Sequence, residues 1–334
     1  MNTPYRVIGA ELSPFSVKVR SYFRFKNIPH QWVVRSLAVQ QQYGEYFRIP
    51  VIPLVITPDD QSMQDSTPIM EALESQYPET AADPKDPTLK FVSALLEEFG
   101  DEWANKWMFH YRWRRDIDQQ SAAGRLAGMM LPQASESDRA PIVEQVLERM
   151  PGRLWFVGSS DQTAPIIESN FDAALAQLDV HLAERAYLLG QRPSFGDFGL
   201  YCQIYNAWTD PTPGIFIGGS YPNVLAWAQR MLWPSVEGDF EDWAALQPTL
   251  APFLKDHVGG YFMPWTLANE GAINRGEEEF STELAGQTWT QKPQKYHAKS
   301  LAALREKYAA QAGNQELAAL LRDVGCLAAL QPLE

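Results

Sequence analysis

Cysteine is scarce in this sequence, and its placement excludes one kind of chemistry. The 334 residues contain only Cys202 and Cys326, which lie far apart and lack the Cys-x-x-Cys spacing of a dithiol centre. Isolated thiols without a disulfide framework are typical of a reduced compartment. We therefore expect a cytoplasmic protein, and we exclude a dithiol redox centre.

Positive charge, long apolar stretches and metal-binding patterns are also in short supply. Lysine and arginine number 28 against 41 acidic residues, so the net charge is −13. Nucleic acids and anionic membranes select basic surfaces, and we expect neither as a partner. No run of about 18 apolar residues occurs, and the first residues lack the apolar core of a signal peptide. The five histidines show no metal-ligand spacing, so we predict no metal.

What the sequence does contain begins with alternating strand and helix signals. Ser13 and Pro14 suit the cap and the first turn of one helix, and Ser66 or Thr67 suits the cap of another. Strand signals lie at 6–10, 30–36 and 54–57, with a short return strand after a turn at 58–61. The predicted order is β-α-β followed by β-β-α.

A stretch rich in proline, aspartate and threonine, at 78–88, separates this region from a helical one. Helical periodicity then covers roughly 89–116, 120–130, 139–150, 166–184, 195–208 and 222–232. From about 250 the sequence predicts a hairpin around Ala285-Gly286 and a helix over 296–310. We predict an α/β domain over 1–80, a linker over 81–88, an all-helical domain over 89–249 and an extension over 250–334 packed on the helical domain.

Five motifs in order resemble the cytosolic glutathione transferase superfamily. They are "SPFSVKVR", "VIPLVI", "MQDSTPIMEALE", "RPSFGDFGLY" and "YPNVLAWAQRM", and they cover roughly residues 5–235. The "SPF" start is most similar to the tau and omega classes. The resemblance implies a thioredoxin-like domain followed by an all-α domain, with glutathione as co-substrate. It also implies a homodimer, unless the extension covers the surface used for pairing.

The resemblance makes Ser13 the candidate catalytic residue. A thiol with a pKa near 8.5 is only slightly ionised at neutral pH, and lowering that pKa by two units requires about 2.7 kcal/mol. A hydroxyl donor at the positive end of a helix supplies an effect of that size. The alternative is that Ser13 only caps its helix. Ser16, one turn on, is expected to hydrogen-bond within the helix. Without a cysteine at position 13, reactions through a mixed disulfide are disfavoured.

By the same resemblance, Phe15, Ile52, Pro53, Gln64, Asp65 and Ser66 bind glutathione. A cis bond before Pro53 would present the backbone of Ile52 to the cysteinyl part of the tripeptide, as an added strand does. The alternatives are a trans proline at the start of an edge strand, or the same role for Pro50.

At the other end of the tripeptide, Ser66 would bind the γ-glutamyl carboxylate at a helix start, and Asp65 would bind the α-amino group, with help from Gln64. Alternatively, these residues form only a capping cluster. The glycyl carboxylate has no clear partner, and Gln41 and Arg48 are the candidates.

The stretch 101–116 is unusually aromatic. On a helix, Trp103, Trp107, His110, Tyr111 and Arg114 share one face. In the superfamily the matching helix lines the second-substrate pocket, so Trp107, His110, Tyr111 and Arg114 are the candidates for holding a hydrophobic electrophile. The alternative is a core stripe of aromatic residues with Trp103 and Trp107 inside.

We therefore expect a glutathione transferase that conjugates the Ser13-stabilised thiolate to a hydrophobic electrophile. Two other functions stay open, because fold does not determine function. One is a non-catalytic glutathione-binding or interaction module, and the other is a glutathione-dependent lyase, isomerase or dehalogenase.

Overall fold

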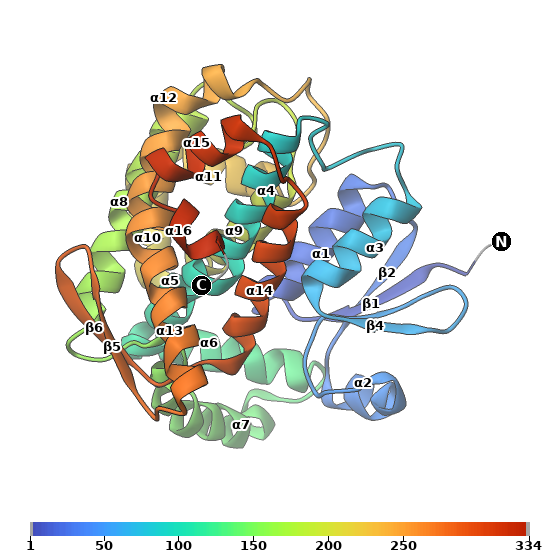
Figure 1. Cartoon of the computed structure of the whole chain (residues 1–334). Coiled ribbons are helices and arrows are strands. Elements are labelled where there is room, and N and C mark those ends of the chain that lie inside the picture. Colours follow the sequence, from blue (N-terminus) through green and yellow to red (C-terminus); the bar gives the residue numbers. More distant parts are fainter. Residues whose placement is uncertain (1–2, 332–334) are drawn as a thin grey trace.

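The computed structural model describes residues 3–331 and begins with a four-stranded sheet flanked by helices (Figure 1). The sheet has the strand order β2-β1-β3-β4, in which β1 and β2 are parallel and β3 pairs antiparallel with β1 and β4. This topology confirms the predicted thioredoxin-like domain. Its elements are β1 (Tyr5–Gly9), α1 (Pro14–Phe25), β2 (His30–Val34), α2 (Leu37–Gln42), β3 (Leu54–Ile56), β4 (Ser62–Gln64) and α3 (Ser66–Gln76).

Both faces of this sheet are covered. Val7 and Val55 belong to the main core, on the face where α1 and α3 lie side by side (Figure 1). Ile8 and Leu54 point to the opposite face and pack against apolar residues of the 39–47 segment. Because both faces are covered, the central strands β1 and β3 are short and mainly apolar, with Arg6 as the exception.

The two helices of this domain start differently. α1 begins as predicted, with the Ser13 side chain accepting a hydrogen bond from the Ser16 N–H. α3 was expected to have Ser66 or Thr67 as its cap, but the cap position is Asp65 and its side chain makes no capping bond. Asp65 has a φ of +79°, which turns the chain sharply from β4 into the helix.

The second domain is all-helical, as expected, with two differences from the predicted elements. The single helix expected over 89–116 is divided by a π-helical segment (Gly100–Ala104). Two further helices, over 211–220 and 243–253, were not predicted, because these stretches contain helix-breaking proline or glycine. No helix within residues 3–331 is both long and apolar enough to span a bilayer. The helices are α4 (Pro87–Phe99), α5 (Asn105–Arg114), α6 (Asp116–Met130), α7 (Glu136–Arg149), α8 (Ala164–Leu182), α9 (Phe195–Trp208), α10 (Pro211–Ser220), α11 (Pro222–Arg230) and α12 (Trp243–Phe253).

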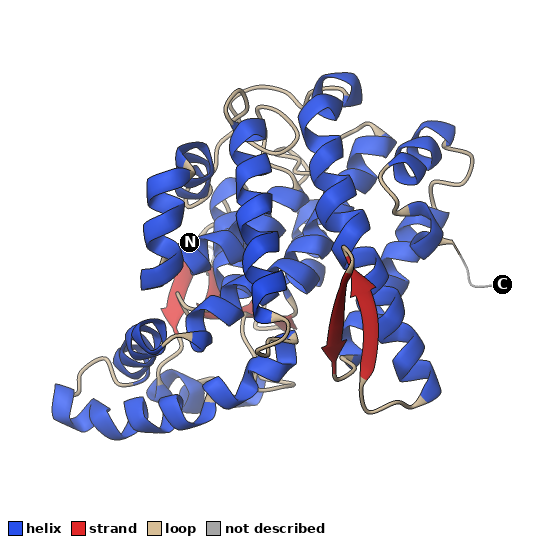
Figure 2. Cartoon of the chain, turned by 90° about the vertical axis from the view of Figure 1, so that its left-hand side faces the viewer, coloured by secondary structure: helices blue, strands red, loops and turns tan. Residues whose placement is uncertain are grey.

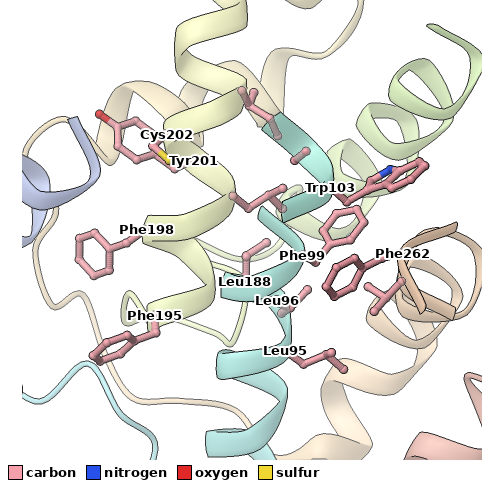
Figure 3. Close-up of a cluster of buried hydrophobic side chains, with 14 of the residues drawn as sticks. Leu95, Leu96, Phe99, Trp103, Leu188, Phe195, Phe198, Tyr201, Cys202 and Phe262 are labelled. Atoms are coloured by element: carbon pink, nitrogen blue, oxygen red, sulfur yellow. The ribbon is translucent and has the colours of Figure 1, made fainter. Parts of the chain in front are cut away.

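The contact between α4 and α9 is unusually close. A Cβ on Gly100 would lie 2.4 Å from the carbonyl carbon of Gly199, and a Cβ on Gly199 would lie 2.8 Å from the Cα of Glu97. Only glycine permits backbones to approach to this distance. Figure 3 shows the two helices side by side, with buried aromatic and aliphatic side chains around them.

The extension contains the predicted hairpin and helix. The hairpin is separate from the four-stranded sheet (Figure 2) and packs on α13. Trp265 of α13 and Trp289 of β6 contact Trp103, with ring centroids 6.0 and 5.5 Å away. The elements are a π-helical segment (Leu254–Phe262), α13 (Met263–Arg275), β5 (Phe280–Leu284), β6 (Gln287–Gln291), α14 (Lys295–Ala309), α15 (Gln315–Asp323) and α16 (Leu327–Leu330).

α14 brings the extension to the first domain. It packs along α4 and reaches α3, beside which it lies in Figure 1. Lys307 on α14 pairs with Glu71 on α3 at 2.8 Å, while Tyr308 packs edge-on against Phe91 of α4. A single helix from the extension therefore contacts both domains.

Candidate functional site

Three segments singled out from the sequence meet at one edge of the sheet. β3 runs antiparallel to β1, and Leu54 at the start of β3 lies opposite Gln64 at the end of β4. The end of β1, the start of β3 and the end of β4 are therefore neighbours. The loops that carry Ser13, Pro53 and Asp65 all connect at this edge.

The Ser13 hydroxyl caps α1 through its oxygen, and its O–H group is left free to donate a hydrogen bond. Its oxygen accepts hydrogen bonds from the Ser16 N–H at 3.3 Å and from the Ser16 hydroxyl at 3.0 Å. Both bonds use oxygen lone pairs, and no acceptor among residues 3–331 takes the Ser13 proton. Ser13 is partly exposed at the positive end of α1. The hydroxyl can therefore cap the helix and still donate to an anion in front of it.

The loop before Ser13 is held by an arginine that sequence reasoning missed. Arg112, buried on α5, donates from Nη1 to the Leu12 carbonyl at 2.8 Å. Its Nε donates to Asp210 at 2.8 Å and its Nη2 to the Asn206 carbonyl at 2.9 Å. Burial lowers the pKa of Arg112, and the Asp210 carboxylate opposes that effect. The helical domain thereby fixes the loop that presents Ser13.

The peptide bond between Ile52 and Pro53 is cis, as predicted, so the trans alternative is excluded. Ile52 is partly exposed, and no residue within 3–331 forms a hydrogen bond to its N–H or C=O. Both backbone groups are therefore available to a ligand that adds on as a short extended segment.

Gln64 lies at the end of β4 as expected, but its side-chain amide bonds to the loop that precedes Ile52. Its side-chain NH₂ donates to the carbonyls of Ile49 and Val51, each at 2.9 Å. Its side-chain oxygen accepts from the Arg48 N–H at 2.9 Å. Because both donors are used, Gln64 orders the loop before Ile52 and has no free amide donor to offer a ligand.

The remaining expected contacts on this side are at the surface. Phe15 is half-buried in the first turn of α1. Gln41 and Arg48, the candidates for the glycyl carboxylate, are both exposed. Neither has a side-chain hydrogen bond to another described residue, so the structure leaves both available without favouring one.

The start of α3 offers donors above a buried cation. The N–H groups of Ser66 and Thr67 have no acceptor within the described chain, as is usual in a first helical turn. Beneath them, Lys18 of α1 directs its Nζ at the two hydroxyls, 3.4 Å from Ser66 and 3.2 Å from Thr67. This arrangement suits a carboxylate at the helix start, beside the exposed side chain of Asp65.

Lys18 is balanced by two carboxyl groups of the second domain. Its Nζ forms ion pairs with Glu97 and with Asp101, the latter at 2.6 Å. Burial alone would lower the pKa of Lys18, but the two acids reverse that effect and raise it. Burial and the neighbouring Glu97 raise the pKa of Asp101, an effect that the Lys18 ammonium opposes. The sequence contained no local signal for this cluster, whose members are some 80 residues apart.

The aromatic face of 101–116 lies mostly in the core. Trp107 stacks on Phe171 with centroids 5.0 Å apart. His110 is fully buried between the Ser159 hydroxyl at 2.8 Å and the Glu168 carboxylate at 3.0 Å. Burial lowers the pKa of His110, so it is neutral at neutral pH.

The other two second-substrate candidates point elsewhere. Tyr111 is buried against Phe171 and Phe216, whereas Arg114 is at the surface and pairs with Asp161. The four side chains therefore do not form one pocket wall. Trp107, His110 and Tyr111 follow the alternative interpretation, that of an aromatic core stripe.

Two domain families match the sequence. The glutathione S-transferase N-terminal domain matches residues 7–81, and the glutathione S-transferase C-terminal domain matches residues 140–230. These matches, in that order and on this fold, show that the chain belongs to the glutathione S-transferase superfamily. The comparison with curated protein sequences finds no match.

Solved structures resemble the chain at low identity. A glutathione S-transferase from Methylobacterium radiotolerans, in complex with glutathione sulfonate, is 20% identical and has a TM-score of 0.42, covering 72% of this chain and 99% of its own. The beta-etherase LigF from Sphingobium sp. strain SYK-6 is 18% identical, with a TM-score of 0.48 and coverages of 69% and 95%. A tau class enzyme from mango is 16% identical, with a TM-score of 0.41 and coverages of 76% and 100%. The superfamily assignment depends on the two domain matches.

Proposed function

We propose that the protein is a glutathione transferase in which Ser13 stabilises the glutathione thiolate for attack on a hydrophobic electrophile. The observation that carries this proposal is the hydrogen bonding of Ser13. Ser16 occupies the lone pairs of its oxygen while its proton keeps no acceptor in the described chain. A thiolate in front of α1 would accept a charge-assisted hydrogen bond from the Ser13 hydroxyl, next to the helix N-terminus.

The rest of the sheet edge suits the tripeptide. The free backbone groups of Ile52 would hold the cysteinyl part, the first turn of α3 the γ-glutamyl carboxylate, and Asp65 the α-amino group. The thiolate would form the new carbon–sulfur bond as the leaving group departs with its electron pair. The protein contributes orientation and electrostatics, without a covalent enzyme intermediate.

Two steps test the proposal. Retention of the protein on immobilised glutathione, followed by turnover of a generic aryl halide, separates an enzyme from a binding module. Ser13→Ala should still be retained but lose about tenfold to a hundredfold in kcat, because it removes one hydrogen bond to a charged group. An unchanged kcat in this variant would contradict the role of Ser13.

A further inference from the structure

The extension reaches the residue proposed to hold the α-amino group of the ligand. The hydroxyl of Tyr296, near the start of α14, donates to Oδ2 of Asp65 at 2.7 Å. Tyr296 lies outside both matched domains, which end at residues 81 and 230. The residue is 55% exposed, so its contribution here is the hydroxyl group and not core packing.

Other contacts hold this part of α14 in place. The imidazole Nδ1 of His297, the next residue, contacts the buried Glu102 carboxylate, and the Ser300 hydroxyl donates to the same carboxylate at 2.9 Å. The ion pair of Lys307 with Glu71 secures the other end of the helix against α3. The Tyr296 hydroxyl is therefore presented to Asp65 from a fixed helix.

A cavity of about 420 Å³ adjoins this contact, between α3, α4 and α14. Six carboxylic residues and two lysines are among the side chains that line it: Asp65, Glu71, Glu98, Asp101, Glu102, Glu306, Lys299 and Lys307. Glu98 is only 7% exposed and has no hydrogen-bond or ion-pair partner within residues 3–331. Glu71, Asp101 and Glu102 already face Lys307, Lys18 and His297, and burial raises the pKa of Glu98. The exposed carboxylates of the lining that have no cationic partner within residues 3–331 are therefore those of Asp65 and Glu306.

We propose that Tyr296 is a positioning residue that orients Asp65 toward the α-ammonium of the γ-glutamyl group, so that the extension completes the glutathione site. This inference rests on the proposed function. Tyr296 holds one oxygen of the carboxylate, which leaves the other for the ammonium. Since the Asp65 carboxylate has no cationic partner within the described chain, the site should select thiol peptides with a free α-ammonium over those that lack it.

Calorimetry on the full chain tests the role of Tyr296. Tyr296→Phe should weaken glutathione binding by about threefold to tenfold, the effect of one hydrogen bond. Tyr308→Phe is the matched control, because it makes the same change on the same helix at a hydroxyl with no hydrogen bond to the described chain. The control should bind glutathione with the Kd of the unaltered protein. Equal Kd values for Tyr296→Phe and the unaltered protein would overturn the inference.

A second ligand separates positioning from a general structural effect. The glutathione analogue with a glutaryl group in place of γ-glutamyl lacks only the α-amino group. Tyr296→Phe and the unaltered protein should bind this analogue with the same Kd. In an Asp65→Asn background, adding Tyr296→Phe should not weaken glutathione binding further. Equal losses for glutathione and the analogue would overturn the positioning role while leaving the proposed function intact. No binding of glutathione to the unaltered protein would instead overturn the proposed function, and the inference with it.

Discussion

Two regions of the interior each enclose a lysine, but only one of these lysines has hydrogen-bond and charge partners. Under the candidate site, Lys18 has four oxygen partners, two from carboxylates and two from hydroxyls. Under the extension, Lys106 of α5 has no hydrogen-bond partner for its Nζ within the described chain and lies 3.8 Å from the centre of the Trp265 ring. Both side chains are almost completely buried.

The electrostatic outcome differs accordingly. The acids around Lys18 raise its pKa against the effect of burial, whereas burial lowers the pKa of Lys106 to about 7, with Glu102 opposing the shift. The comparison teaches that the charges beneath the site are balanced and fixed in place by their partners. Beneath the extension, a charge is accommodated mainly by aromatic contact.

The largest effect is expected from Lys18→Met. The change leaves Glu97 and Asp101 buried without their counter-charge, which costs about 3–5 kcal/mol of unfolding free energy. Urea denaturation followed by circular dichroism measures this loss. A variant as stable as the unaltered protein would show that the cluster beneath the site does not depend on Lys18.

The same change at the other lysine should have the opposite sign. Lys106→Met removes an unpartnered buried cation and should stabilise the protein by about 1–3 kcal/mol. In the unaltered protein, the unfolded chain binds more protons than the folded one between the lowered pKa of about 7 and the ordinary lysine value of about 10.5. Stability should therefore rise with pH across this window. Lys106→Met should flatten that rise, and an identical pH profile for both proteins would contradict the assignment.

A smaller loss is expected at the contact between α4 and α9, next to Glu97. The methyl group of Gly199→Ala would collide with the Glu97 backbone, and such overpacking costs about 1–3 kcal/mol. Because alanine favours a helix by about 1 kcal/mol over glycine, the net loss should be no more than about 2 kcal/mol. Gly218→Ala on α10, where a new methyl meets nothing within 4 Å, is the control and should not lose stability.

The smallest effect concerns the site itself. Ser16→Ala removes one of the two donors to Ser13 and leaves the backbone N–H in place. The thiol pKa of bound glutathione should rise by less than about one unit, because the net value of one hydrogen bond is about 1 kcal/mol. A rise as large as that caused by Ser13→Ala would mean that the two serines act as a pair.

The first domain could be predicted well from the sequence because its signals are local. Ser13 before Pro14 marks a helix start, and the proline at 53 stands directly before a short apolar strand. Such features depend on a few neighbouring residues, which is why the order of elements along the chain agrees with the structure. The cis bond before Pro53 followed instead from the family resemblance, and the structure confirms it. Asp65 departs from this pattern, since its positive φ shifts the expected cap by one residue.

The missed parts of the site depend on distant contacts. Lys18 and Arg112 have their partners about 50 to 100 residues away. Lys18 lies within the motif SPFSVKVR, but nothing in that motif names its partners, and Arg112 lies in none of the five motifs. On 101–116 the periodicity showed which residues could share a face, but not what covers that face. Phe171 of α8 and Phe216 of α10 pack on Trp107 and Tyr111, so that much of the expected pocket wall is core.

The most direct test of the central claim is an ultraviolet titration of the thiol in bound glutathione, in the unaltered protein and in Ser13→Ala. The account predicts a bound thiol with a pKa about two units below the free value of about 8.5, and a return of most of that shift in the variant. A bound thiol that titrates at the free value in both proteins would contradict it.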